Sequence, residues 1–252
     1  MRRHAGDEAQ QVVVIGACAA PRRLRRRARP ATTDAEPVDV TRATVIAAAP
    51  HEGETAAEAW LERAGETVAE SLAVLNRALH SRRIAAADPY AGEVTARHAL
   101  VTRVGYGTGE QVAEGRWTAA RELPPERGRL AREAALRPQE RFAALLSGFD
   151  VSPACELLAL RARLDLDQAR DREAALQTEA ALGAALAELE SWRELPGMPE
   201  RIDELRSFAD TVAAARAAAC AGALDEATRA VVEQVLGRLE AALRARTAGA
   251  EF

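Results

Sequence analysis

The stretch from Ser152 to Leu195 constrains the fold more than any other part of the chain. Ser152 followed by Pro153 is typical of a helix start, since serine caps an unpaired N–H and proline at the first helical position loses no bond. The leucines that then recur at helical spacing are Leu157, Leu160, Leu164, Leu182, Leu186 and Leu189. We therefore expect helices that pack on their neighbours through this leucine face.

Two polar residues interrupt the leucine face and leave two interpretations open. Gln168 and Asp171 fall where apolar residues would continue it. One interpretation is a continuous helix of roughly 60 Å, and the other, which we favour, is a helical hairpin that turns near Asp167–Asp171. A second, smaller apolar face consists of Leu158, Ala162, Leu166, Ala169, Leu176, Ala180 and Ala187. Helices that are apolar on two sides are usually sandwiched between neighbours.

Composition supports a mainly α fold. Much of the 48% apolar content is alanine, and aromatic residues make up only 4% of the 252 residues. Alanine has the highest helix propensity and little bulk, so it favours closely packed helices. We expect a helical bundle or a set of helical hairpins, behind an N-terminal arm that is either disordered or contains short strands.

The predicted domain organisation has four parts. Two prolines and a glycine in Leu123–Arg129 predict a linker over 123–129. It separates an N-terminal helical region, 51–122, from a C-terminal helical bundle, 130–248, and residues 1–50 form the arm. Within 130–248, the pattern predicts a short helix over 130–136 and another beginning at Pro138.

In the N-terminal helical region we expect three helices. Thr55 with Glu58, and Thr67 with Glu70, have the spacing of capping boxes at helix starts. Asp88-Pro89 predicts a third helix, with Tyr90, Val94, His98 and Val101 on its apolar face. On that face His98 is either a core histidine satisfied by a polar partner or a general base, and we favour the core histidine.

Two β-branched runs lie in and next to the arm. Gln11–Ala20 and Val38–Ile46 are the only obvious partners for each other as short strands. Ile15-Gly16-Ala17-Cys18 also resembles the cleavage box of bacterial lipoproteins. Asp7 and Glu8 in front of the run, and the arginines behind it, disfavour export, so we expect a strand pair or a disordered arm.

Charge is divided unevenly along the chain. Residues 1–30 hold eight arginines against two carboxylates, a net charge of +6, so the remainder carries −10 of the overall −4. Six of these arginines form the candidate nucleic-acid-binding set Arg22, Arg23, Arg25, Arg26, Arg27 and Arg29. They would neutralise phosphates without reading sequence. The alternatives are a solvated tail, or an arm folded onto the acidic body.

The segment Arg103–Gln111 is the candidate binding loop. Gly105, Gly107 and Gly109 stand at alternate positions, close to Arg97 and Arg103. Such glycines let backbone N–H groups converge on an anion. The segment has neither the dinucleotide fingerprint nor a P-loop lysine. A helix stop followed by a turn explains the same glycines, and we favour that interpretation.

No stretch carries a catalytic or cofactor signature. The three cysteines, Cys18, Cys155 and Cys220, form no Cys-x-x-Cys pair, which argues against a zinc site or a disulfide framework and suits a reducing cytoplasm. All 34 basic residues are arginine, which we attribute to codon usage in a GC-rich, bacterial genome. We expect no catalytic site, metal or cofactor. The prediction is a cytoplasmic protein-interaction module, an adaptor or self-associating scaffold, and the alternative is nucleic-acid association through the arm.

Overall fold

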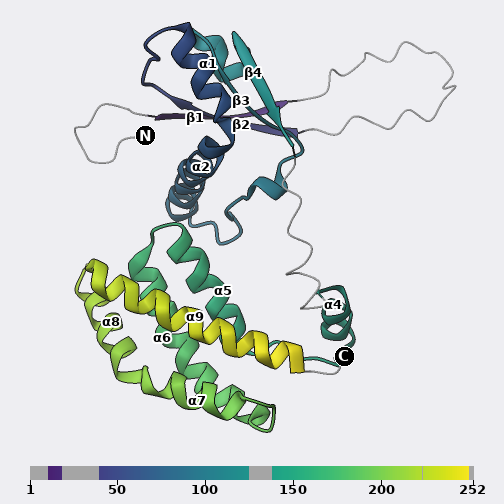
Figure 1. The fold of residues 1–252 in the computed structure, drawn as a ribbon, viewed down its shortest axis with the longest axis vertical. Helices are drawn as coiled ribbons and strands as arrows, with labels where there is room; N and C mark the ends of the chain where they lie inside the picture. The colour runs from purple at the N-terminus through teal and green to yellow at the C-terminus, as the bar shows by residue number, and fades with distance from the viewer. Residues whose placement is uncertain (1–10, 19–39, 125–137, 223, 250–252) are drawn as a thin grey trace, which may run out of the picture. The chain divides into compact units, whose positions relative to one another are not determined.

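The chain forms two compact units that divide between Glu126 and Arg127. The computed structural model describes residues 11–18, 40–124, 138–222 and 224–249. The fold is mainly α, with two small antiparallel sheets, both in the first unit. Figure 1 shows the helices of the second unit in green and yellow and the strands of the first in purple and teal.

The N-terminal unit combines helices with two strand pairs. Its elements are β1 (Gln11–Cys18), β2 (Val40–Ala47), α1 (Glu54–Glu62), α2 (Ala64–Ala86), the 3-10 helix η1 (Ala96–His98), β3 (Thr102–Tyr106), the 3-10 helix η2 (Glu110–Glu114) and β4 (Ala119–Leu123). β1 pairs with β2 in register from Gln11↔Ala47 to Cys18↔Val40, as the two β-branched runs predicted. β3 pairs with β4 from Thr102↔Leu123 to Tyr106↔Ala119.

The third helix predicted from Asp88-Pro89 is wrong. The buried side chain of Asn76, on α2, takes up both backbone groups of Val94: its Nδ2 donates to the Val94 carbonyl at 3.0 Å, and its Oδ1 accepts from the Val94 N–H at 2.9 Å. An irregular segment that contains the 3-10 helix η1 therefore replaces the helix. His98 is exposed rather than in a core, and its Nδ1 accepts the Thr95 N–H at 3.2 Å.

Both capping boxes predicted for the first two helices are also wrong. α1 begins at Glu54 behind Gly53, one residue before Thr55, and no side chain caps it. α2 begins at Ala64, so that Thr67 lies inside its first turn. The two helices are almost continuous, because only Arg63 separates them. The observed structure is therefore closer to one long helix than to two separately capped helices.

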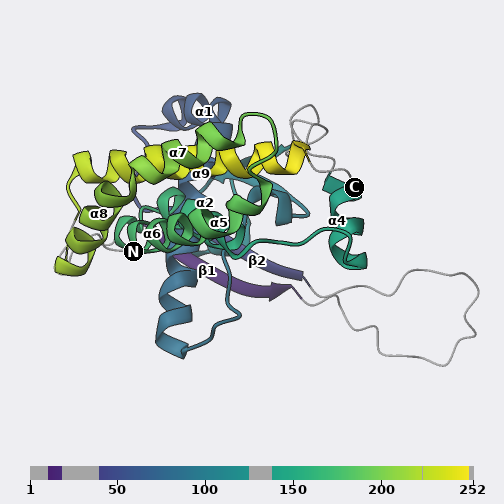
Figure 2. The same cartoon turned by 90° about the horizontal axis from the view of Figure 1, so that it is seen from below.

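The C-terminal unit is a bundle of helices. Its elements are α4 (Pro138–Ser147), α5 (Ala154–Asp167), α6 (Asp171–Glu188), the 3-10 helix η3 (Leu189–Trp192), α7 (Met198–Ser207), α8 (Ala209–Ala221) and α9 (Glu226–Gly249). The hairpin interpretation is confirmed, since α5 and α6 are separate helices joined through Ala169 at φ 55°. In both views α9 extends alongside the other helices, while α4 stands at one end of the unit (Figures 1 and 2). The helix predicted over 130–136 lies outside the described residues.

Alanine makes up much of the buried surface of α5 and α6. The fully buried or nearly buried alanines of this pair are Ala159, Ala162, Ala174, Ala175, Ala181 and Ala185. Such small side chains allow two helices to approach closely. The buried face of α9, which includes Val232, Val235, Leu236 and Leu239, closes the same core.

The prediction that α5 packs on its neighbours through its leucine face is wrong. Leu157, Leu160 and Leu164 are 50%, 65% and 37% exposed, whereas Cys155 and Ala162 are fully buried. Helical spacing locates an apolar face but does not say which of two faces is covered. Here close helix packing selects the face with the smaller side chains.

The cap expected at Ser152 is wrong as well. α5 begins at Ala154, and the carboxylate that caps it belongs to Glu188, at the far end of α6. Its Oε1 accepts the Ala154 N–H at 3.1 Å, and its Oε2 accepts the Cys155 N–H at 3.0 Å. The hairpin thus satisfies its own first N–H groups across the pair.

Candidate functional site

The predicted anion loop forms part of the β3–β4 hairpin. Gly105 lies in β3, Gly107 follows that strand, and Gly109 precedes η2 with φ 78°. Arg103 forms a 2.9 Å ion pair with Glu122, its partner in the strand register. Arg97 lies in η1, before β3. Anion binding by this loop stays a prediction.

Two of these glycines make room for Trp117. A Cβ at Gly105 would lie 2.8 Å from Trp117 Cε3 and 2.6 Å from the Ala119 carbonyl oxygen. A Cβ at Gly107 would lie 3.2 Å from Trp117 Cα. The glycine spacing therefore reflects the close return of the chain in a strand hairpin, rather than the helix stop that we favoured.

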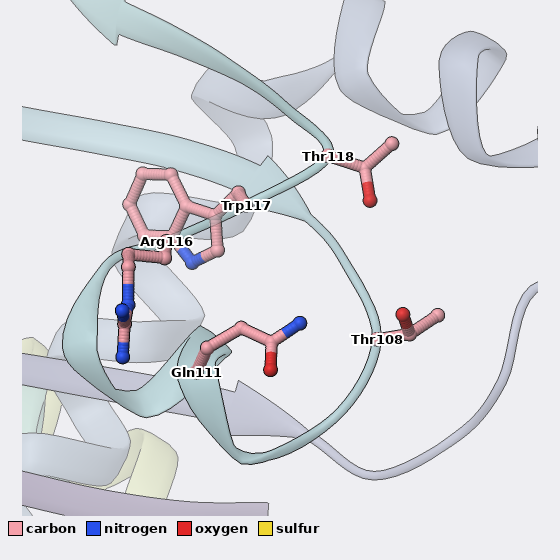
Figure 3. Close-up of a pocket in the computed structure, with 5 residues that line it drawn as sticks. All are labelled: Thr108, Gln111, Arg116, Trp117 and Thr118. Atoms are coloured by element: carbon pink, nitrogen blue, oxygen red, sulfur yellow. The ribbon is translucent and has the colours of Figure 1, made fainter.

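A shallow pocket of about 400 Å³ opens beside this loop. It is lined by Thr108, Gln111, Arg116, Trp117 and Thr118 (Figure 3). The Trp117 indole N–H donates to the Val112 carbonyl at 3.2 Å, which fixes the ring, and Arg116 forms an ion pair with Glu114. Hydroxyls, an amide and a guanidinium suit a small polar molecule, although the ion pair offsets the positive charge that would attract an anion.

An aromatic cluster includes one residue of this loop, Tyr106. The His51 ring stands 5.1 Å from that of Trp60 and 6.4 Å from that of Tyr106. Desolvation, followed by the negative charges of Glu58 and Glu54, raises the pKa of Tyr106. Its phenol is therefore neutral at physiological pH.

The strongest candidate site is an exposed apolar surface on the C-terminal unit. We define the α4–α5 apolar surface by seven side chains that are 37–89% exposed: Phe142, Leu146, Phe149, Val151, Leu157, Leu160 and Leu164. The chain has only four phenylalanines, and two of them lie here. Single exposed apolar side chains are normal, but three leucines exposed along one face of a helix, Leu157, Leu160 and Leu164, indicate an interaction site. The sequence reasoning missed this surface because it assigned the leucines to the core.

Buried ion pairs hold α4 and the start of α5 in place. Arg141 donates to both oxygens of Glu156, at 2.5 and 2.6 Å, and its Nε donates to Asp150 at 3.2 Å. Arg246, on α9, donates to the same Asp150 carboxylate and to the Val151 carbonyl at 2.9 Å. The surface is therefore attached to the bundle by directional bonds, although its apolar side chains are not covered.

The guanidinium of Arg246 is held from a second direction. It lies 4.5 Å from the centroid of the Trp192 ring, in cation–π geometry, and its side chain is only 2% exposed. An arginine so completely buried requires its partners, and it fixes the segment around Asp150 relative to α9.

Other candidates give no further site in the described part of the chain. Arg22, Arg23, Arg25, Arg26, Arg27 and Arg29 lie outside the described residues, and nucleic-acid binding through them stays a prediction. The described residues contain no group of three or more histidine, cysteine or carboxylate side chains that could hold a metal ion. None of the described helices is both long and apolar enough to cross a membrane. Comparison of the chain with protein-family models, with curated proteins and with solved structures returns no match.

Proposed function

We propose that the chain is a helical protein-interaction module whose α4–α5 apolar surface binds an amphipathic helix of a partner protein. The observation that carries this proposal is the exposed row Leu157, Leu160 and Leu164, spaced i, i+3 and i+7 on α5. A partner helix with the same spacing presents complementary side chains, as in helix-in-groove recognition.

The energetics of the row suit such a partner. Full burial of one leucine contributes about 1.5–3 kcal/mol relative to full exposure, so covering a half-exposed leucine contributes on the order of 1 kcal/mol. Phe142 and Phe149, 63% and 89% exposed, add larger areas. Several such side chains together are needed to exceed the entropic cost of association.

The charge beside the leucine row indicates which charge a partner helix should carry next to its apolar stripe. Arg161 lies between Leu160 and Leu164 in sequence, is exposed, and forms no ion pair with another described residue. Arg163, in contrast, pairs with Glu240 at 2.8 Å. A partner helix with a carboxylate beside its apolar stripe would pair with Arg161, so we propose an acidic, amphipathic helix.

The test compares two charge insertions at side chains of similar exposure. Leu160→Asp places a carboxylate in the row, and Ile84→Asp does the same on α2, where the side chain is 69% exposed against 65% for Leu160. Partners captured by the full-length protein are identified, and their affinity is then measured for each variant by titration calorimetry. We expect at least a tenfold weaker affinity for Leu160→Asp alone.

Two results would contradict the proposal. In one, both variants bind the identified partner as tightly as the wild type. In the other, Leu160→Asp lowers the melting temperature far more than Ile84→Asp, which would show that the leucine row is already covered in the folded protein. An Arg161→Glu variant tests the acidic flank, because reversal of that charge should weaken binding of an acidic helix and strengthen that of a basic one.

A further inference from the structure

A second surface lies in the N-terminal unit, at the edge of strand β1. Within the described part of the chain β1 and β2 form a two-stranded sheet to which no further strand is added. In an antiparallel ladder every second residue directs its N–H and C=O toward the paired strand, and the residues between direct theirs outward. Over Val12–Ala17 the outward groups have no ladder partner among the described residues.

The composition of β1 leaves this edge unprotected. Its sequence, QVVVIGAC, contains no charged residue and no proline. The register with β2 advances one residue at a time, so no bulge twists the strand away. Edge strands in soluble proteins are usually blunted by charge, proline or a bulge, because an open edge is a template for another strand.

β2 carries two side-chain hydrogen bonds to the rest of its unit. Arg42 donates to the Glu114 carbonyl at 2.8 Å, and the buried Thr44 donates to the Ala113 carbonyl at 3.3 Å. Both contacts attach β2 to η2. β1 is the strand of this sheet whose composition, without charge or proline, leaves its edge open to another strand.

Both faces of β1 are suited to a neighbouring apolar strand. Val12 is 44% exposed and Ile15 is 52% exposed, and they point to opposite faces because their positions in the strand differ by three, an odd number. A strand added at this edge would cover part of each side chain. Opposed β-branched residues contribute roughly 0.2–1 kcal/mol per pair.

We infer that β1 pairs antiparallel with β1 of a second copy of this chain. An uncharged strand opposite itself brings no like charges together, and a two-fold contact of this kind closes without further growth. The product is a four-stranded sheet in the order β2-β1-β1-β2.

The test measures the mass of the full-length protein in solution, with reductant present so that Cys18 cannot link two copies. Ile15→Lys places a charge at the edge, as natural edge strands do. Ala43→Lys is the matched control, because Ala43 is exposed and pairs with Ile15 but belongs to β2, outside the proposed contact. By light scattering we expect a dimer for the wild type and for Ala43→Lys, and a monomer for Ile15→Lys.

A wild-type monomer at every concentration, or a dimer that survives Ile15→Lys, overturns the inference. Hydrogen exchange of the wild type guards against misfolding of the variant. Self-pairing predicts slow exchange at consecutive amides from Val12 to Ala17, whereas slow exchange at alternate amides alone contradicts it. Leu160→Asp should leave the dimer intact, so failure of this inference and failure of the proposed partner surface remain distinguishable.

Discussion

Replacement of Asp150 should destabilise the C-terminal unit more than replacement of either arginine that it binds. The Asp150 carboxylate is 6% exposed and lies between Arg246, 2% exposed, and Arg141, 16% exposed. Asp150→Ala leaves two guanidiniums without their shared anion. Arg246 then keeps only the Val151 carbonyl and the ring of Trp192.

The magnitude follows from the burial of the pair. Removal of one partner from a buried ion pair costs about 3–5 kcal/mol, because the other charge stays buried and uncompensated. For a unit of this size each kcal/mol lowers the melting temperature by about 3–5 °C, a total of roughly 10–20 °C. Arg246→Met should cost less, because Asp150 keeps Arg141 and methionine retains an apolar stem against Trp192.

The pH dependence gives the same prediction a second, independent signature. Burial alone would raise the pKa of Asp150, but hydrogen bonds from Arg246, Arg141 and the Val151 N–H outweigh it and hold the pKa below its ordinary value. The bonded carboxylate therefore stabilises the fold fully above the unfolded pKa of about 4, and this contribution is lost as the pH falls through the folded pKa. Asp150→Asn, which does not titrate, should approach the wild type in stability on acidification.

Urea titration of the full-length protein provides the measurement, with hydrogen exchange of the α9 amides assigning the transition to the C-terminal unit. The experiment compares the wild type with Asp150→Ala, Asp150→Asn and Arg246→Met at neutral and acidic pH. A free energy of unfolding for Asp150→Ala within about 1 kcal/mol of the wild-type value would refute the prediction, because breaking a buried pair should cost more. A larger loss of stability for Arg246→Met than for Asp150→Ala would refute it as well.

Two further predictions concern a thiol and two glycines. Burial and the neighbouring carboxylate of Glu188 raise the pKa of Cys155 to about 12, so iodoacetamide at pH 8 should modify the exposed Cys220 and spare Cys155 until the unit unfolds, as peptide mass spectrometry would show. Early modification of Cys155 would contradict its burial. Gly105→Ala should destabilise the N-terminal unit, whereas Gly183→Ala, with open space around its Cβ inside α6, should stabilise the C-terminal unit by about 0.5–1 kcal/mol. Equal effects in thermal unfolding would disprove the steric argument.

Local patterns predicted those parts of the fold that depend on local chemistry. The β-branched runs around Val13 and Val45 predicted the first strand pair, and the polar gap at Gln168 favoured the hairpin. Asp225, directly before α9, is a residue type typical of a helix start, and its Oδ1 accepts the Thr228 N–H at 2.7 Å. In each case the residues that decide the outcome lie close together in sequence or share one residue preference.

Long-range contacts decided the parts that the sequence could not predict. The spacing of Val94, His98 and Val101 fits a helix, but Asn76 binds both backbone groups of Val94, which lies in an irregular segment instead. The pocket beside the glycine loop also depends on a long-range contact, because Trp117 lies against that loop only when β4 pairs with β3. The exposed leucines of α5 have the same spacing as buried ones, because the spacing does not say which face of a helix its neighbours cover.

Helix α5 packs through its small residues and exposes its leucines, and this arrangement places two different constraints on how the sequence could evolve. Ala162 and Ala175 are fully buried, where even one additional methyl group would have to displace a neighbour. Geometry alone therefore selects against change there, whatever the unit does. Leu157 and Leu160 face solvent, and the fold would tolerate polar substitutes for them. Lasting retention of leucine at these positions would record selection for binding rather than for folding.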